Sequence, residues 1–100
     1  MSQNTPLADL RDAISALDNE LLALLAKRQS FTNQVAQTKI AHNIPVRDPV
    51  REEQLLIKLI QAGQKHGLDP HYITKLFHVI IEDSVLNQQA LLSAKANPEL

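Results

Sequence analysis

The feature that most constrains this chain is a stretch of 38 residues without glycine or proline, which runs from Leu7 to Ile44 between Pro6 and Pro45. Apolar residues recur in it at spacings of three and four, the pattern of a helix with one apolar face. They are Leu7, Leu10, Ile14, Leu17, Leu21, Leu24 and Leu25. Such a helix would extend about 57 Å, whereas a domain of this size has a radius of gyration near ~13 Å. We therefore expect its apolar face to be covered by a partner chain or left in water.

Start and stop signals divide the chain into three predicted helices. Thr5-Pro6, Asp48-Pro49 and Asp69-Pro70 each place a capping residue before a proline, which favours a helix start. The predicted helices cover about 6–42, 49–65 and 70–94, with Gly67 as the residue that ends the second. No alternating strand pattern is present. The sequence predicts an all-α fold and one domain over residues 1–100, with polar chain ends that fray.

Composition excludes several classes of protein. The chain has no cysteine, so neither disulfides nor thiolate–zinc sites can form. A net charge of −1 gives no nucleic-acid footprint, and no apolar run is long enough for a bilayer. The four histidines lack metal-binding spacing, and we see no glycine-rich phosphate loop and no Ser/His/Asp set. We expect a cytoplasmic location, since the N-terminus lacks a signal-peptide core.

Polar residues interrupt the apolar stripes of all three predicted helices. Arg28 has the same azimuth as Leu10, and Lys39 lies about 20° from Arg28. On the third helix, Ser84 and Gln88 are i, i+4 neighbours inside the apolar stripe. Cations are rarely buried unless an anion meets them.

The second predicted helix adds two charged residues in its first turn. Arg51 stands where the helix dipole disfavours a cation, and Glu52 falls in the middle of the apolar face. If the three stripes converge on one core, these polar groups converge on one mostly cationic pocket.

Arg11 cannot join the same pocket within one chain. It lies about 25 Å from Arg28 along the helix and about 100° around it. An antiparallel two-fold dimer of the long helices would bring Arg11 of one chain to the far end of the other, and would cover the leucines as well.

Each of these residues also has an ordinary explanation. Arg28 can snorkel to the surface, Lys39 can complement the dipole of a helix end, and Asp48 can be only a cap. Ser84 can bond back to its own helix. The remaining residues can be plain surface groups; these are Arg11, Arg51, Glu52 and Gln88.

Four segments together resemble the all-helical class of chorismate mutases, over about residues 6–92. They are LRDAISALDNELLALLAKR, VAQTKIA, IPVRDPVREEQLL and HYITKLFHVIIEDSVLNQQALL. The likeness is greatest to the N-terminal mutase domain of enterobacterial bifunctional chorismate mutase–prephenate dehydratases. Those enzymes continue into a dehydratase beyond the position of Leu100, and the sequence leaves open whether this chain is a separated domain or a monofunctional enzyme.

The resemblance implies an intertwined helical homodimer that rearranges chorismate to prephenate without a cofactor, in aromatic amino-acid biosynthesis. It assigns the two substrate carboxylates to Arg28 and to Arg11 of the partner subunit, and the ether oxygen to Lys39 and Gln88. By the same resemblance, Glu52 and the backbone of Asp48 contact the ring hydroxyl. Supporting contacts near a carboxylate fall to Arg51 and Ser84.

Two other functions remain open. An isochorismate–pyruvate lyase can use the same fold and a similar cationic pocket, because a fold does not fix a function. A non-catalytic dimerisation module would explain the long apolar helix but not the polar residues inside three stripes.

Overall fold

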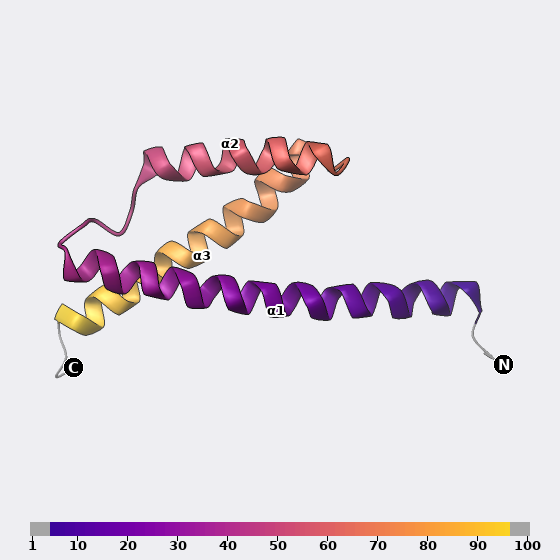
Figure 1. Ribbon diagram of the computed structural model, residues 1–100, viewed down its shortest axis with the longest axis horizontal. Helices are drawn as coiled ribbons and strands as arrows, with labels where there is room; N and C mark the ends of the chain where they lie inside the picture. Colours follow the sequence, from indigo (N-terminus) through magenta and orange to yellow (C-terminus); the bar gives the residue numbers. More distant parts are fainter. Residues whose placement is uncertain (1–4, 97–100) are drawn as a thin grey trace. The chain divides into compact units, whose positions relative to one another are not determined.

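The computed structural model describes residues 5–96 and is helical throughout its regular parts (Figure 1). Helix α1 spans Pro6–Ala41, α2 spans Pro49–Lys65 and α3 spans Pro70–Ala96. The described residues contain no strand, which confirms the predicted all-α class. The expected fraying covers residues 1–5 and the chain from about Asn97; all of these lie outside the described part except Thr5, which is hydrogen-bonded to the first turn of α1. No helix within residues 5–96 has both the length and the apolarity that a membrane span requires.

The chain divides into two compact units, Met1–Phe31 and Thr32–Leu100, and the boundary falls inside α1. In the first unit, the predicted apolar face of α1 lies open. Leu10, Leu17 and Leu24 expose 63%, 61% and 64% of their surface. Isolated exposed leucines are common, but a continuous apolar stripe marks an interaction surface.

Capping residues fix where α1 begins and ends. The Thr5 hydroxyl accepts a hydrogen bond from the Ala8 backbone N–H at 3.1 Å, which satisfies one of the free donors of the first turn. After Ala41 the chain turns through Asn43, whose φ of 55° is left-handed and is tolerated by asparagine. The Ile44 N–H then donates to the Lys39 carbonyl at 2.8 Å, which closes the last turn.

The turn between α2 and α3 is short and depends on two glycines. Gly67 has a φ of 77°, which an L side chain rarely adopts. The Leu68 N–H donates to the Gly63 carbonyl at 2.9 Å and so caps the end of α2. A Cβ atom at Gly63 would lie 2.8 Å from Cγ1 of Ile73. The missing side chain therefore lets α3 approach α2 closely, and the two helices meet at this turn (Figure 1).

The core of the second unit is small. Its buried apolar residues are Ala36, Val46, Ile73 and Val85. The predicted inner face of α2 is only half-buried; it comprises Leu55, Leu56, Leu59 and Ile60. Because the apolar positions are incompletely covered, this fold leaves a large apolar area available for association.

Candidate functional site

Six of the eight predicted site residues lie in the second unit, on the end of α1, the 42–48 connection, α2 and α3. They are Lys39, Asp48, Arg51, Glu52, Ser84 and Gln88. The other two, Arg11 and Arg28, lie on the part of α1 in the first unit; Arg11 is exposed and Arg28 is partly buried.

Lys39 is held by the connection that follows its own helix. Its ammonium group donates to the backbone carbonyl of Val46 at 2.8 Å, in a partly buried hydrogen bond. Val46 itself is 7% exposed, so the acceptor lies at the edge of the core. This contact fixes the lysine side chain, where a solvated surface lysine would sample many rotamers.

The side chains of Asp48 and Glu52 both accept backbone hydrogen bonds at the start of α2. The Asp48 carboxylate accepts from the Arg51 backbone N–H at 3.1 Å, and the Asp48 N–H donates to Oε2 of Glu52 at 3.2 Å. The arrangement resembles a capping box, but the glutamate that accepts from the cap's N–H is the fourth helical residue and not the third. The Asp48 N–H and the Glu52 carboxylate, which the family resemblance assigns to one ligand group, are therefore hydrogen-bonded to each other.

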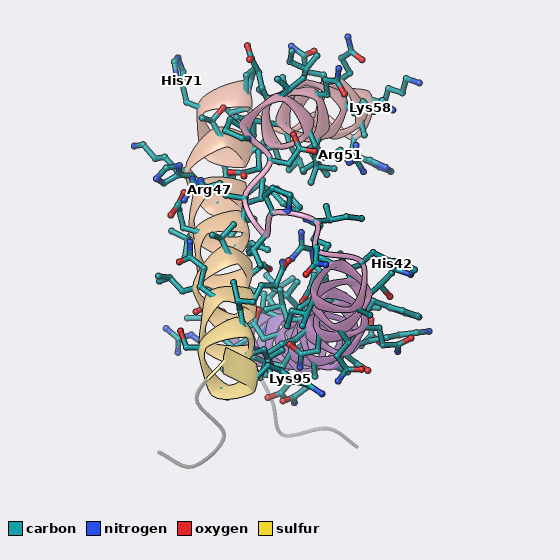
Figure 2. All side chains as sticks on the ribbon, turned by 90° about the vertical axis from the view of Figure 1, so that its left-hand side faces the viewer. His42, Arg47, Arg51, Lys58, His71 and Lys95 are labelled. Carbon is teal, nitrogen blue, oxygen red and sulfur yellow. The ribbon has the colours of Figure 1, made fainter. Side chains whose placement is uncertain are left out.

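Arg47 completes this group from the connection and was not predicted as a site residue. Its guanidinium lies 3.1 Å from Oε1 of Glu52 and also pairs with Glu82 of α3, with one N–H···O distance of 3.3 Å. The hydrogen bond from Arg47 lowers the pKa of the Glu82 carboxyl, and that same bond raises the pKa of Arg47. Figure 2 shows Arg47 beside α3, whereas Arg51 and Lys58 extend from α2.

One feature of the sequence indicates that Arg47 lies near the neighbouring helices. It is the only cation between Pro45 and Pro49, in a connection too short to direct its side chain far from the neighbouring helices. Glu82 gave no such signal, because an acidic residue two positions before Ser84 is ordinary on a helix.

Gln88 is the most deeply buried of the predicted polar residues. It is 7% exposed, and within the described residues its Oε1 atom is buried without a hydrogen-bond partner. An unsatisfied buried polar atom costs about 1–3 kcal/mol, so such atoms call for an explanation such as a bound ligand. Gln88 therefore does not face water, which was the ordinary explanation for it.

The contacts of Ser84 and Arg51 give weaker support for their predicted roles in a binding site. The Ser84 hydroxyl donates to the carbonyl of Ile80 at 3.0 Å, which is the bond to its own helix that the sequence analysis left open. Arg51 is exposed, and its backbone rather than its side chain contacts Asp48.

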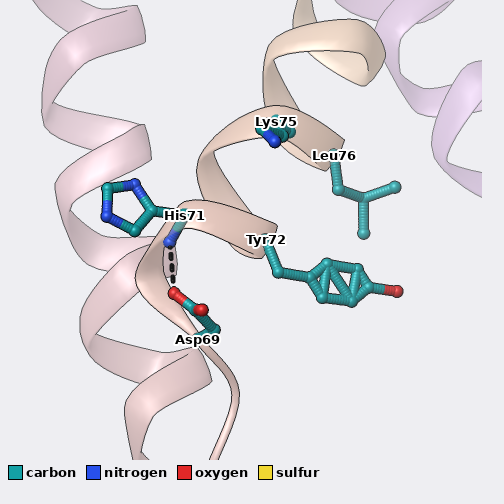
Figure 3. Close-up of a pocket in the computed structure, with 5 residues that line it drawn as sticks. All are labelled: Asp69, His71, Tyr72, Lys75 and Leu76. Atoms are coloured by element: carbon teal, nitrogen blue, oxygen red, sulfur yellow. Dashed lines mark hydrogen bonds between the residues drawn. The ribbon is translucent and has the colours of Figure 1, made fainter.

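Described residues of α3 line pockets at two places. One of about 220 Å³ includes Glu52 in its wall; its lining is Arg47, Glu52, Glu53, Leu56, His78, Ile81 and Glu82. The other, of about 510 Å³, lies at the start of α3 and contains no predicted site residue (Figure 3). There Asp69 caps the helix by accepting from the His71 N–H at 2.8 Å, and the Tyr72 and Leu76 side chains project beside it. In residues 5–96 no group of three or more His, Asp or Glu side chains is placed to hold a metal ion.

Comparison with known proteins places these residues in a family. A family model described as chorismate mutase type II matches residues 10–89. The chain is 54% identical, over 97% of its length, to the bifunctional chorismate mutase/prephenate dehydratases of Enterobacter agglomerans and Escherichia coli K12, and spans about a quarter (25%) of their length. It is 32% identical to the chorismate mutase of Methanocaldococcus jannaschii, over 91% of this chain and 92% of that protein. With most of both chains aligned, this chain belongs to the type II chorismate mutase family.

Proposed function

We propose that this chain is a chorismate mutase, which converts chorismate to prephenate in the biosynthesis of phenylalanine and tyrosine. The observation that carries the proposal is Gln88, a buried amide with an unpaired oxygen on a largely apolar helix face that it shares with Ser84. Because the chain belongs to the type II chorismate mutase family, we propose that chorismate is the partner of that amide. We also propose that residues 1–100 act as one mutase domain; a cytoplasmic location stays a prediction.

The reaction is a unimolecular Claisen rearrangement, in which one C–O bond breaks as one C–C bond forms. It needs no nucleophile and no general base. The required contribution is to hold the substrate folded, with its reacting carbons in contact. In our proposal Arg28 and Arg11 of the partner subunit each bind one carboxylate through a bidentate guanidinium fork, while Arg51 and Ser84 support the carboxylate contacts.

Negative charge grows on the ether oxygen as the C–O bond breaks. In our proposal the Lys39 ammonium and the Gln88 amide donate to that oxygen. A half-turn about the last side-chain bond of glutamine exchanges its oxygen and NH2 group, so the Gln88 amide can present a donor at the same place. Donors that are already in position stabilise the transition state most, because they need no reorganisation during the reaction. The bond from Lys39 to Val46 restrains the ammonium in advance.

Glu52 and the Asp48 backbone are proposed to bind the ring hydroxyl. They are already hydrogen-bonded to each other, so both groups meet the substrate at one place. The hydroxyl does not take part in bond making or breaking, and these contacts therefore bind substrate and transition state alike.

We propose that the active form is a homodimer. The exposed leucines of α1 support this, since burying a leucine side chain fully contributes about 1.5–3 kcal/mol and several stand in one row. Arg11, at the start of the same helix, would then complete the partner's site.

The test is product analysis with purified protein. Incubated with chorismate, it should form prephenate far faster than the uncatalysed reaction does, as followed by absorbance and by NMR of the product. Release of pyruvate from isochorismate, with no prephenate from chorismate, would favour the lyase. Absence of both products, together with no saturable binding of a cyclic dicarboxylate, would favour the dimerisation module.

A further inference from the structure

We infer that Arg47 is a positioning residue, which holds the Glu52 carboxylate in place for the substrate's ring hydroxyl by anchoring it to Glu82 of α3. The inference rests on the proposed function for the identity of the substrate. The geometry on which it depends is independent of the proposed function and lies entirely within Thr32–Leu100.

Both oxygens of the Glu52 carboxylate are engaged. Oε1 lies 3.1 Å from the Arg47 guanidinium, and Oε2 accepts from the Asp48 N–H at 3.2 Å. A glutamate has three rotatable side-chain bonds and would otherwise sample many conformers. With a partner on each oxygen, the carboxylate has a set direction, and each oxygen keeps a lone pair for a further donor such as a hydroxyl.

Arg47 can hold Glu52 only if Arg47 is itself held. Its second partner, Glu82, supplies that support, because the guanidinium contacts both oxygens of the Glu82 carboxylate. Glu82 belongs to α3, the helix that carries Ser84 and Gln88. One arginine thus links the connection, the first turn of α2 and the middle of α3, and the guanidinium fork allows it to serve two carboxylates at once.

Stability alone does not account for this arrangement. The side chains of Arg47, Glu82 and Glu52 are 45%, 36% and 21% exposed, and ion pairs at such exposure contribute little to folding. What the pair does provide is a fixed distance between two elements that both carry proposed site residues. Its loss should therefore change substrate binding more than folding.

The kinetic test is a double-mutant cycle. Arg47→Ala should raise KM for chorismate by about tenfold and change kcat by less than about twofold, because a hydroxyl contact is made equally in substrate and transition state. Glu82→Gln should raise KM in the same direction by roughly threefold. In an Glu52→Ala background, Arg47→Ala should have no further effect. Lys58→Ala, which removes an exposed cation from α2, is the matched control and should leave KM unchanged.

Two outcomes would overturn the inference. One is a KM for Arg47→Ala equal to that of the wild type; the other is an equal effect of Arg47→Ala with and without Glu52, which would make the arginine an independent or merely structural group. Crystal structures without ligand test the positioning by itself. Glu52 should keep its hydrogen bond to the Asp48 N–H in the wild type and adopt other rotamers in Arg47→Ala. An inactive wild type would refute the proposed function, and the structural comparison would still decide the role of Arg47.

Discussion

Single residues differ in how firmly the fold fixes them, and this difference sets their expected effect on catalysis. Lys39 is restrained by a backbone carbonyl, and Gln88 is restrained by burial. The Ser84 hydroxyl, in contrast, donates its hydrogen bond to the carbonyl of Ile80. Restraint before the substrate arrives is what makes a donor effective in a transition state.

We predict that Lys39→Ala lowers kcat by about 100- to 1,000-fold, the usual effect of removing one donor to a developing oxyanion. Ser84→Ala should lower kcat much less, since its proton is already used within α3. Steady-state kinetics on the two variants, with Lys58→Ala as control, makes the comparison. Equal and small losses for both would contradict the roles proposed for them.

Because the Gln88 amide is buried with an unpaired oxygen, its removal should raise the stability of the protein and lower its activity. Gln88→Met keeps the length of the side chain and removes the unpaired oxygen, so the free energy of unfolding should rise by about 1 kcal/mol. The same change removes a donor, and kcat should fall by about 100-fold. Urea unfolding and kinetics measure the two effects. Gln89→Met, on the exposed neighbour, should change neither. A less stable Gln88→Met protein would show that the amide is satisfied within the fold.

At the scale of helices, the close approach of α2 and α3 depends on Gly63. Gly63→Ala should lower the free energy of unfolding by about 1–3 kcal/mol, because the new Cβ meets Cγ1 of Ile73 at 2.8 Å. That cost exceeds the gain of about 1 kcal/mol in helix propensity. In an Ile73→Ala background, the same change at Gly63 should become neutral or stabilising. A cost that persists in this background would locate the strain elsewhere.

The ion pair between the connection and α3 predicts a dependence on acid. The pKa of the Glu82 carboxyl is lowered by the hydrogen bond from Arg47 and, to a smaller extent, by the charges of Arg47 and His78. A carboxyl with a lowered pKa stabilises the folded state above the pKa of the unfolded chain, and that stabilisation is lost as the pH falls through the folded pKa. The free energy of unfolding should therefore decline less with acid in Glu82→Gln than in the wild type. Urea melts from neutral pH to about pH 3.5 should show a small difference in slope, because the pair is exposed; a steeper decline in Glu82→Gln than in the wild type would contradict the prediction.

The helices were more predictable from sequence than the contacts between them. Thr5, Asp48, Asp69 and the proline after each are local signals, and α1, α2 and α3 begin at those prolines. The azimuth of Gln88 in an apolar stripe indicated burial but left a surface position open, and the structure shows that the residue is buried. The ion pair of Arg47 with Glu82 joins residues 35 positions apart, and no local pattern specifies such a contact. The roles of the site residues remain predictions.

At the scale of the whole molecule, the leucine face of α1 should govern both assembly and activity. Leu17→Asp places a charge in the middle of that face, and desolvating a carboxylate in an apolar interface is costly. We predict a shift from dimer to monomer in light scattering, with loss of mutase activity, because Arg11 would no longer reach a partner's site. Ser15→Asp adds the same charge at a polar position of the helix and should leave both unchanged. A fully active monomer would refute the shared site.

Lys39 makes two hydrogen bonds in the turn after α1, so the length of this turn affects the position of its ammonium group. Its backbone carbonyl receives the Ile44 N–H, and its ammonium reaches the Val46 carbonyl, each at 2.8 Å. The loop is therefore closed by hydrogen bonds to Lys39, the residue that is proposed to donate to the ether oxygen. Inserting a single residue between Asn43 and Val46 would displace the Lys39 ammonium, although every side chain that is proposed to contact the substrate would still be present. We therefore expect mutase activity to be lost more readily by a change of length in this loop than in other surface loops.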